Sequence, residues 1–151
     1  MPRVAVIGAR GYTGAELLPL LHHHPAFEIV AVASGSAAGE PVTDHVPGME
    51  GSELVFSDLR PADLASIEMN ACVLALPNGA AAPYVGVIDN TRPDTVIVDL
   101  GADYRFDEGW VYGQPERFGE RLEGARRIAN PGCYATGAQL ALAPLLGRLE
   151  G

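Results

Sequence analysis

The chain has 151 residues, 48% of them hydrophobic, so it can bury one core and is expected to form a single domain. Its formal net charge of −9, with no basic run, argues against a nucleic-acid partner. No apolar stretch approaches the roughly 18 residues of a membrane span, so no membrane partner is expected. Two cysteines far apart in the sequence do not suggest a disulfide framework, which predicts reduced thiols and a cytoplasmic protein.

The chain begins with the pattern of a dinucleotide-binding turn. Residues 4–7 are a short apolar run, typical of a parallel strand buried on both faces. The run leads into G-x-x-G-x-x-G at residues 8–14, and residues 15–21 predict a helix. Glycines let the backbone turn tightly and approach a pyrophosphate, whose charge then faces the helix start. Placed between a strand and a helix, the pattern predicts phosphate binding.

Three adjacent histidines, His22–His24, close this helix before Pro25. Consecutive residues lie about 100° apart around a helix, so the three side chains cannot share one face. No metal site is therefore expected.

The segment after the second strand, which is expected over residues 27–33, bears on the cofactor. An NAD-binding fold would present an Asp or Glu about 20 residues after the last glycine. This chain presents Ser34-Gly35-Ser36 and no acid until Glu40. Hydroxyls can accept a 2′-phosphate that a carboxylate would repel, and Arg10 could add a charge-assisted contact, so NADP is favoured over NAD. Ser34 and Ser36 could also be ordinary turn residues.

Strands and helices keep alternating along the chain. The pattern predicts a loop at 37–52, a short strand at 54–56, a short helix from residue 61, a strand at 71–76, a helix over 80–89, a strand at 95–100, a long loop through residue 116 and a short strand at 126–129. This alternation predicts an α/β domain of the Rossmann type, a doubly wound, mostly parallel sheet with helices on both faces.

Two strand ends carry further candidates. Ligands bind at the carboxyl ends of parallel strands, so Asn78 and Gly79 are expected near the cofactor, although plain turn chemistry explains them nearly as well. Arg105, beyond the strand at 95–100, could bind an anion or simply pair with nearby aspartates. Cys72 lies within a predicted strand and is expected to be structural.

The other cysteine, Cys133, comes directly after a Pro-Gly pair and opens an Ala- and Leu-rich run, 134–149, that predicts a helix. A helix start carries free N–H groups and the positive end of the helix dipole, and both favour an anion. The thiolate is the nucleophilic form of cysteine, so this position suits a nucleophile. Free cysteines are also commonly small buried residues, and by itself Cys133 could be one.

Four segments together resemble one enzyme family. They are GARGYTG at 8–14, VDLGADYR at 98–105, VYGQPE at 111–116 and NPGCYAT at 130–136. Over its whole length the chain is similar to the N-acetyl-gamma-glutamyl-phosphate reductases of arginine biosynthesis, within the aspartate-semialdehyde dehydrogenase superfamily. The block around the cysteine is the most specific part, since the aspartate-semialdehyde dehydrogenases proper carry a different run there.

The resemblance implies a thioester mechanism. The Cys133 thiolate would attack the acyl phosphate of N-acetyl-glutamyl 5-phosphate, and NADPH would then reduce the thioester to N-acetyl-glutamate 5-semialdehyde. The N–H of Tyr134 could stabilise the oxyanion, and Arg105 and Asn130 would bind the substrate. The residues expected to bind the cofactor are Gly8, Arg10, Gly11, Tyr12, Thr13, Gly14, Ser34, Ser36, Asn78 and Gly79.

The chain departs from the family at two points. Asn78 stands where many members have a histidine, and all four histidines precede Cys133, whereas the family's catalytic histidine lies downstream. The resemblance therefore implies that residues 1–151 are the NADP-binding domain, that the substrate and dimerisation domain is absent from this chain, and that the chain alone is inactive. The full-length protein is expected to be a homo-oligomer acting on a small molecule.

Two alternatives stay open. The first is the N-acetyl-aminoadipyl-phosphate reductase of lysine synthesis, since one methylene of substrate length is typically worth only about 1–3 kcal/mol in a pocket. The second is a non-catalytic NADP-binding module in which Cys133 is inert. The reactivity of the cysteine separates that module from an enzyme.

Overall fold

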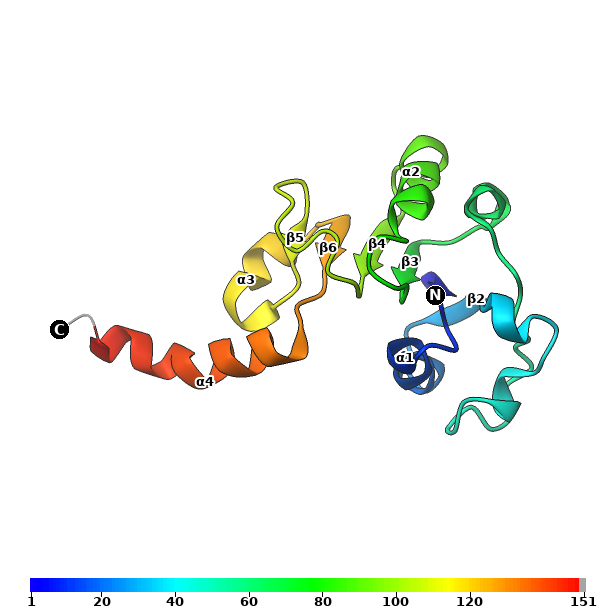
Figure 1. The fold of residues 1–151 in the computed structure, drawn as a ribbon, viewed down its shortest axis with the longest axis horizontal. Coiled ribbons are helices and arrows are strands. Elements are labelled where there is room, and N and C mark those ends of the chain that lie inside the picture. Colours follow the sequence, from blue (N-terminus) through cyan, green and yellow to red (C-terminus); the bar gives the residue numbers. More distant parts are fainter. Residues whose placement is uncertain (150–151) are drawn as a thin grey trace.

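The protein is described by a computed structural model that covers residues 1–149 (Figure 1). The strands are β1 (Arg3–Ile7), β2 (Glu28–Ala33), β3 (Ala71–Leu74), β4 (Val96–Asp99), β5 (Val111–Tyr112) and β6 (Arg127–Ala129). The α-helices are α1 (Tyr12–His22), α2 (Ala82–Thr91), α3 (Pro115–Leu122) and α4 (Cys133–Leu149). Short 3-10 helices are η1 (Gly35–Ala37), η2 (Val42–Asp44) and η3 (Pro61–Ser66).

The strands form one parallel sheet in the order β2-β1-β3-β4-β6-β5. Val6 of β1, for example, pairs with Val32 on one side and with Val73 on the other. Parallel neighbours must be joined by crossover connections, so all the strands end at the same edge of the sheet. That carboxyl edge carries the glycine turn after β1 and the segments that come after β3, β4 and β6.

Helices cover both faces of the sheet, which explains why its strands are apolar on both sides. On one face, Leu18 of α1 is fully buried in a cluster with Val6. On the other face, Ile88 of α2 is fully buried in a cluster with Leu74. Figure 1 shows α1 and α2 on opposite sides of the sheet. The predicted Rossmann-type arrangement is confirmed.

Two local predictions are wrong. Residues 54–56 were predicted to be a strand, but they form only an isolated antiparallel bridge, between Val55 and Pro41. The predicted long loop after residue 100 contains β5 and α3. β5 has only two residues, and α3 has only eight, with non-helical backbone at Phe118, so both are too short to be assigned from a sequence pattern.

The last helix, α4, leads away from the sheet and does not cover either face (Figure 1). Leu140, Leu142 and Leu145 on this helix are exposed. An Ala- and Leu-rich helix normally buries such side chains, so the exposure of these three leucines is unusual. Within residues 1–149, none of the helices combines the length and the apolar character that crossing a membrane requires.

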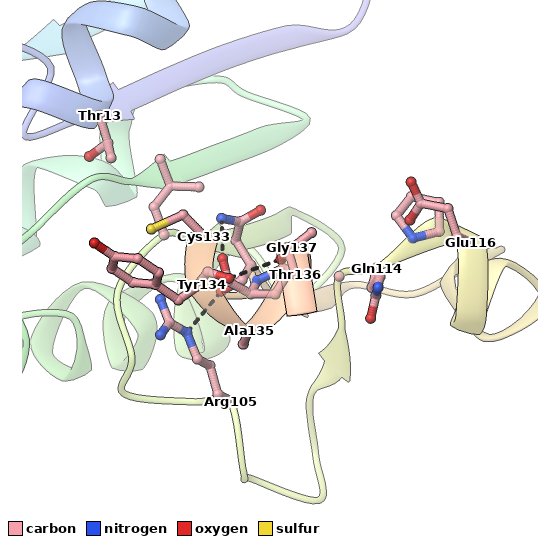
Figure 2. A pocket seen from close by; sticks show the side chains of 15 residues that line it. Thr13, Arg105, Gln114, Glu116, Cys133, Tyr134, Ala135, Thr136 and Gly137 are labelled. Carbon is pink, nitrogen blue, oxygen red and sulfur yellow. Dashed lines mark hydrogen bonds between the residues drawn. The ribbon is translucent and has the colours of Figure 1, made fainter. Parts of the chain in front are cut away.

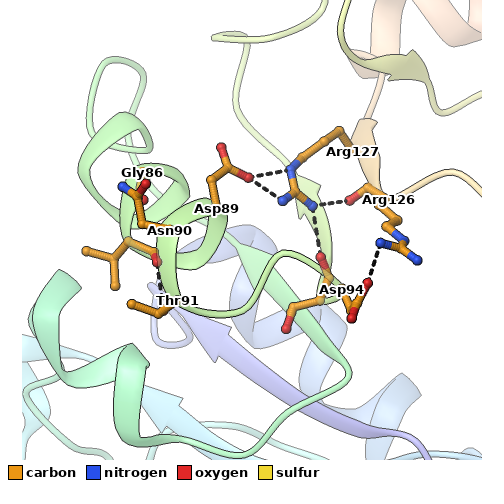
Figure 3. A network of polar contacts seen from close by, with 9 residues as sticks. Gly86, Asp89, Asn90, Thr91, Asp94, Arg126 and Arg127 are labelled. Atoms are coloured by element: carbon orange, nitrogen blue, oxygen red, sulfur yellow. Dashed lines mark hydrogen bonds and ion pairs between the residues drawn. The ribbon is translucent and has the colours of Figure 1, made fainter.

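At the amino edge of the sheet, two arginines at the start of β6 form ion pairs and hydrogen bonds with neighbouring segments (Figure 3). Arg127 donates from Nε to Asp89 of α2 at 3.0 Å and from Nη1 to the carbonyl of Thr95 at 2.8 Å. Its neighbour Arg126 pairs with Asp94. The side chain of Arg127 is 17% exposed and that of Arg126 is 56% exposed. The two arginines therefore form a partly buried ion pair and an exposed ion pair at the same edge of the sheet.

Replacing Arg127 with alanine is expected to lower the free energy of unfolding by about 1–3 kcal/mol, because the carbonyl of the buried Thr95 loses its side-chain donor. Arg126→Ala is the matched control and should cost about 0.5 kcal/mol or less, since exposed ion pairs contribute little. Urea unfolding followed by circular dichroism measures both. Equal losses would show that the hydrogen bond from Arg127 to the Thr95 carbonyl does not stabilise the fold.

Candidate active site

Two glycines of the turn after β1 occupy positions that no other residue fits. Gly8 has a φ of +80°, and a Cβ there would lie 2.2 Å from the carbonyl oxygen of Ala75. A Cβ on Gly14 would lie 2.6 Å from the carbonyl oxygen of Gly8. Both distances are far shorter than any normal contact, so the turn packs backbone against backbone. This close packing brings the start of α1 up to the ends of β1 and β3.

The start of α1 has the properties of an anion site. Gly11 is its N-cap residue, makes no side-chain cap, and is followed by a first turn without acidic residues. The first N–H groups of a helix have no partner within it, so those at Tyr12 and Thr13 remain available to a phosphate. Tyr12 is 87% exposed, so its side chain is open to solvent beside these N–H groups.

Three residues predicted to favour NADP come together beside this turn. Arg10 donates from Nη1 to Ser36 Oγ at 3.2 Å. Ser36 Oγ in turn lies 3.4 Å from Ser34 Oγ. A guanidinium beside two hydroxyls is a suitable group for a phosphate monoester.

One acidic residue near this cluster was not predicted. Asp58 Oδ1 lies 3.3 Å from the position that a Cβ on Gly35 would take. The preceding residue, Ser57, bridges Ala33 in parallel, and this bridge carries Asp58 to the end of β2. Counting residues from the glycine turn could not find Asp58, because a whole loop separates it from β2.

The turns after β3 and β4 are tied together at the carboxyl edge. Asn78 Oδ1 accepts a hydrogen bond from Ala102 N at 3.0 Å. Gly79 N donates to both carboxylate oxygens of Asp103, at 2.8 and 2.9 Å. The Gly79 N–H and the Asn78 side-chain oxygen are therefore engaged within the chain. Both residues stay exposed at the edge where a cofactor would lie.

A cavity of about 1070 Å³ lies between the starts of α1 and α4 (Figure 2). It is lined by Thr13, Leu100, Arg105, residues 113–116 and residues 130–137. Cys133, the first residue of α4, is exposed in this cavity rather than buried. The cavity therefore joins the glycine turn to the cysteine.

Arg105 is held against the segment that precedes Cys133. Its Nε donates to the carbonyl of Asn130 at 3.0 Å, and its Nη1 lies 2.9 Å from the position of a Cβ on Gly132. Thr136 Oγ1 donates to the Gly132 carbonyl at 2.9 Å and so supports the first turn of α4. Arg105 and the segment that contains Asn130 and Cys133, which begins 25 residues further along the chain, thus line one cavity.

Two polar residues of the cavity had no predicted role. Gln114 is buried and Glu116 is exposed, and both line the end of the cavity away from Thr13 (Figure 2). Their segment was predicted to be loop, so only its similarity to a family block marked it.

The two cysteines differ sharply in environment. Burial raises the pKa of the Cys72 thiol to about 12, so it stays protonated at neutral pH. Cys72 lies within β3 and is fully buried, as predicted for a structural residue. Cys133 is exposed, so its thiol is accessible to a substrate.

A buried carboxyl group lies at the end of β4. Asp99 is 1% exposed, and Gly101 N donates to its Oδ1 at 3.2 Å. Its Oδ2 has no hydrogen-bond partner within residues 1–149. Burial raises the pKa of this carboxyl group above its usual value, and the nearby charge of Asp103 acts in the same direction. Folding therefore favours the protonated form of Asp99.

Replacing Asp99 with asparagine is expected to raise the free energy of unfolding at pH 7, by on the order of 1 kcal/mol, because the amide removes a charge that burial disfavours. With a raised folded-state pKa, the aspartate stabilises the fold most below its unfolded pKa and loses stability as pH rises through the folded value. The gain should therefore disappear below about pH 4. Asp107→Asn is the control. Asp107 is exposed and also accepts a hydrogen bond from the N–H two residues further on, that of Gly109, so its replacement should change the free energy of unfolding by less than about 0.5 kcal/mol. Urea unfolding between pH 3 and 8 tests this, and a pH-independent gain would exclude burial of charge as the cause.

The fold and the site define a Rossmann-type dinucleotide-binding domain with a cysteine at the carboxyl edge of its sheet. A family profile described as "Semialdehyde dehydrogenase, NAD binding domain" matches residues 3–125. The chain belongs to this family.

Two bacterial relatives match nearly the whole chain. Both are called N-acetyl-gamma-glutamyl-phosphate reductase. The protein of Xylella fastidiosa (strain 9a5c) is 51% identical over 98% of this chain, which covers 44% of the relative. The protein of Stenotrophomonas maltophilia (strain R551-3) is 49% identical over 98% of this chain, which covers 46% of it. The chain thus spans less than half the length of these relatives.

Solved structures share the fold at low identity. Aspartate semialdehyde dehydrogenase II from Vibrio cholerae superposes with a TM-score of 0.80 at 18% identity, covering 98% of this chain and 43% of that one. The enzyme of Candida albicans, solved with NADP, gives a TM-score of 0.72 at 20% identity, covering 98% and 47%. These likenesses confirm the fold.

Proposed function

We propose that this chain is the NADP-binding and nucleophile-bearing part of an N-acetyl-gamma-glutamyl-phosphate reductase. The reaction would convert N-acetyl-glutamyl 5-phosphate to N-acetyl-glutamate 5-semialdehyde and phosphate, in arginine biosynthesis. The observation that carries the proposal is a single cavity lined by Thr13 of the glycine turn and by Cys133. The names of the relatives favour the glutamyl substrate over the aminoadipyl one.

The residues at the carboxyl edge fit a phosphorylated dinucleotide. The uncapped start of α1, reached through Gly8 and Gly14, would hold the pyrophosphate. Arg10, Ser34 and Ser36 would hold a 2′-phosphate through a guanidinium and two hydroxyls. When bound, NADPH supplies the hydride that reduces an acyl group to an aldehyde.

Cys133 would take the acyl group from phosphate. Its thiolate attacks the carbonyl carbon of the acyl phosphate, and the bond from that carbon to the phosphate oxygen breaks, so phosphate leaves with the electron pair. The product is a thioester on Sγ, whose carbonyl is far more reducible than a carboxylate. After reduction, the carbon–sulfur bond breaks, and the thiolate is regenerated as the semialdehyde leaves.

The neighbours of Cys133 would stabilise the negative charge of these steps. The first N–H groups of α4, including that of Tyr134, lack helical acceptors and could bind the oxyanion. Arg105 would bind a carboxylate or phosphate of the substrate, since its guanidinium is fixed beside Gly132. Asn130 positions this guanidinium through its carbonyl and lines the same cavity.

We extend the proposal to the rest of a protein of the relatives' length. Such a protein would add a second domain that binds substrate and supplies the catalytic histidine, and it would form homo-oligomers. The exposed leucines of α4 support this, because an apolar helix surface favours a covering partner. A cytoplasmic location is proposed with it, since the nucleophile requires a reduced thiol.

Titration of the chain with NADPH and, separately, with NADH tests the cofactor part of the proposal. NADPH is expected to bind at least about tenfold more tightly, because only NADPH has the phosphate that Arg10 and Ser36 would contact. Arg10→Ala should remove most of this preference and leave NADH binding unchanged. Equal affinities for the two dinucleotides would contradict the proposed role of the Arg10 cluster, and a folded chain that binds neither would contradict the proposed function.

A further inference from the structure

A second, smaller cavity of about 100 Å³ adjoins the glycine turn. It lies at the carboxyl ends of β1 and β2, beside the segment that comes after β3, and shares Gly8 with the turn. Its apolar walls come from Ile7, Leu59, Leu76 and Tyr84, and its polar groups from Ser34 and Asp58. If the proposed function is right, a dinucleotide whose pyrophosphate rests on the turn would place its adenosine end here.

A hydrogen bond links two walls of this cavity. Tyr84 OH donates to the carbonyl of Leu59 at 3.1 Å and so joins α2 to the segment that crosses the edge of the sheet. Leu59 and Leu76 present aliphatic surface of the kind on which a flat aromatic ring packs. The cavity therefore suits a planar base.

Asp58 is the charged group of this cavity. Its Oδ1 lies 3.3 Å from the Cβ position of Gly35, so a carboxylate stands at the end of β2. An ionised carboxylate only accepts hydrogen bonds, and it would repel a phosphate. The adenosine end of NADPH offers two kinds of donor that such a group can bind, the free ribose hydroxyl and the exocyclic amine of the base, and of these the amine belongs to the planar base that the cavity suits.

We propose that Asp58 accepts a hydrogen bond from the exocyclic amine of adenine and thereby makes the site select adenine over hypoxanthine. Hypoxanthine carries a carbonyl oxygen in place of that amine. This oxygen and the Asp58 carboxylate are both hydrogen-bond acceptors, so they would repel each other. Asp58 would thus have a role in reading the base, in addition to the 2′-phosphate contacts proposed for Arg10, Ser34 and Ser36.

The test compares NADPH with nicotinamide hypoxanthine dinucleotide phosphate, which differs only in the base. The chain should bind NADPH at least about tenfold more tightly, as expected for a hydrogen bond to a charged group. In Asp58→Ala this ratio should fall to within about twofold. Asp44→Ala, which removes a likewise exposed carboxylate that does not line the cavity, should keep the full ratio.

Because both dinucleotides carry the 2′-phosphate, the ratio cancels any general effect of removing a negative charge. Equal binding of both by the unmodified chain, or an unchanged ratio in Asp58→Ala, would overturn the inference and leave the proposed function standing. Binding of neither by a folded chain would overturn both.

Discussion

A chain with Cys133 replaced by serine is expected to take up no acyl group from N-acetyl-glutamyl 5-phosphate, whereas the unmodified chain gains one. The reason is chemical, because a serine hydroxyl without an activating base is a far weaker nucleophile than a thiolate. We expect acylation to slow by at least about a hundredfold. Intact-mass spectrometry without cofactor measures the added N-acetyl-glutamyl group directly.

The other cysteine provides the matched control. With a pKa of about 12, the Cys72 thiol is ionised in roughly one molecule in ten thousand at pH 8. Cys72→Ala should therefore retain full labelling, and peptide mapping should place the acyl group on Cys133. Labelling that survives in Cys133→Ser, or labelling that maps to a residue other than Cys133, would contradict the thioester mechanism.

Replacing Gly14 with alanine should have the largest effect on the cofactor site. The added methyl group would lie 2.6 Å from the Gly8 carbonyl and 2.7 Å from Ala9 Cα, and both are backbone atoms that no side-chain rotation can move. The turn must therefore shift, at a cost of about 1–3 kcal/mol in the free energy of unfolding. NADPH affinity should fall at least about tenfold, because the N–H groups of α1 move with the turn.

Gly86→Ala in α2 is the control for this substitution. A Cβ there meets nothing within 4 Å, so alanine should stabilise the helix by about 0.5–1 kcal/mol and leave NADPH affinity unchanged. Urea unfolding and calorimetric titration measure the two effects. Normal NADPH binding by Gly14→Ala would show that the close packing of the turn is not needed for the cofactor.

Much of the fold could be predicted because its strands are buried on both faces. Runs such as residues 4–7 and 71–76 are continuously apolar, and each is followed by a glycine or proline turn; the strands found there are β1 and β3, of which β3 ends at Leu74. β5 was not predicted. Its two residues are a strand only because they pair with β6, which comes later in the sequence. Long-range pairing of that kind leaves no local signal.

The site was predictable to the extent that its residues belong to short local patterns. The glycine turn and the Cys133 segment each have the pattern of a strand end followed by a helix, and the structure places both at one cavity. Asp58 and Gln114 were missed for a physical reason. Their positions depend on a single bridge and on a two-residue strand, and these in turn depend on the rest of the fold.

One set of contacts that stabilise this domain lies at the opposite edge of the parallel sheet from the groups that would perform its chemistry. The Arg127 contacts lie at the amino ends of the strands, whereas Cys133 and the glycine turn lie at the carboxyl ends. Substitutions at the amino edge can therefore adjust tolerance to heat without moving a group that would touch the substrate. Lineages that meet different temperatures could vary one end of the sheet while keeping the reaction at the other.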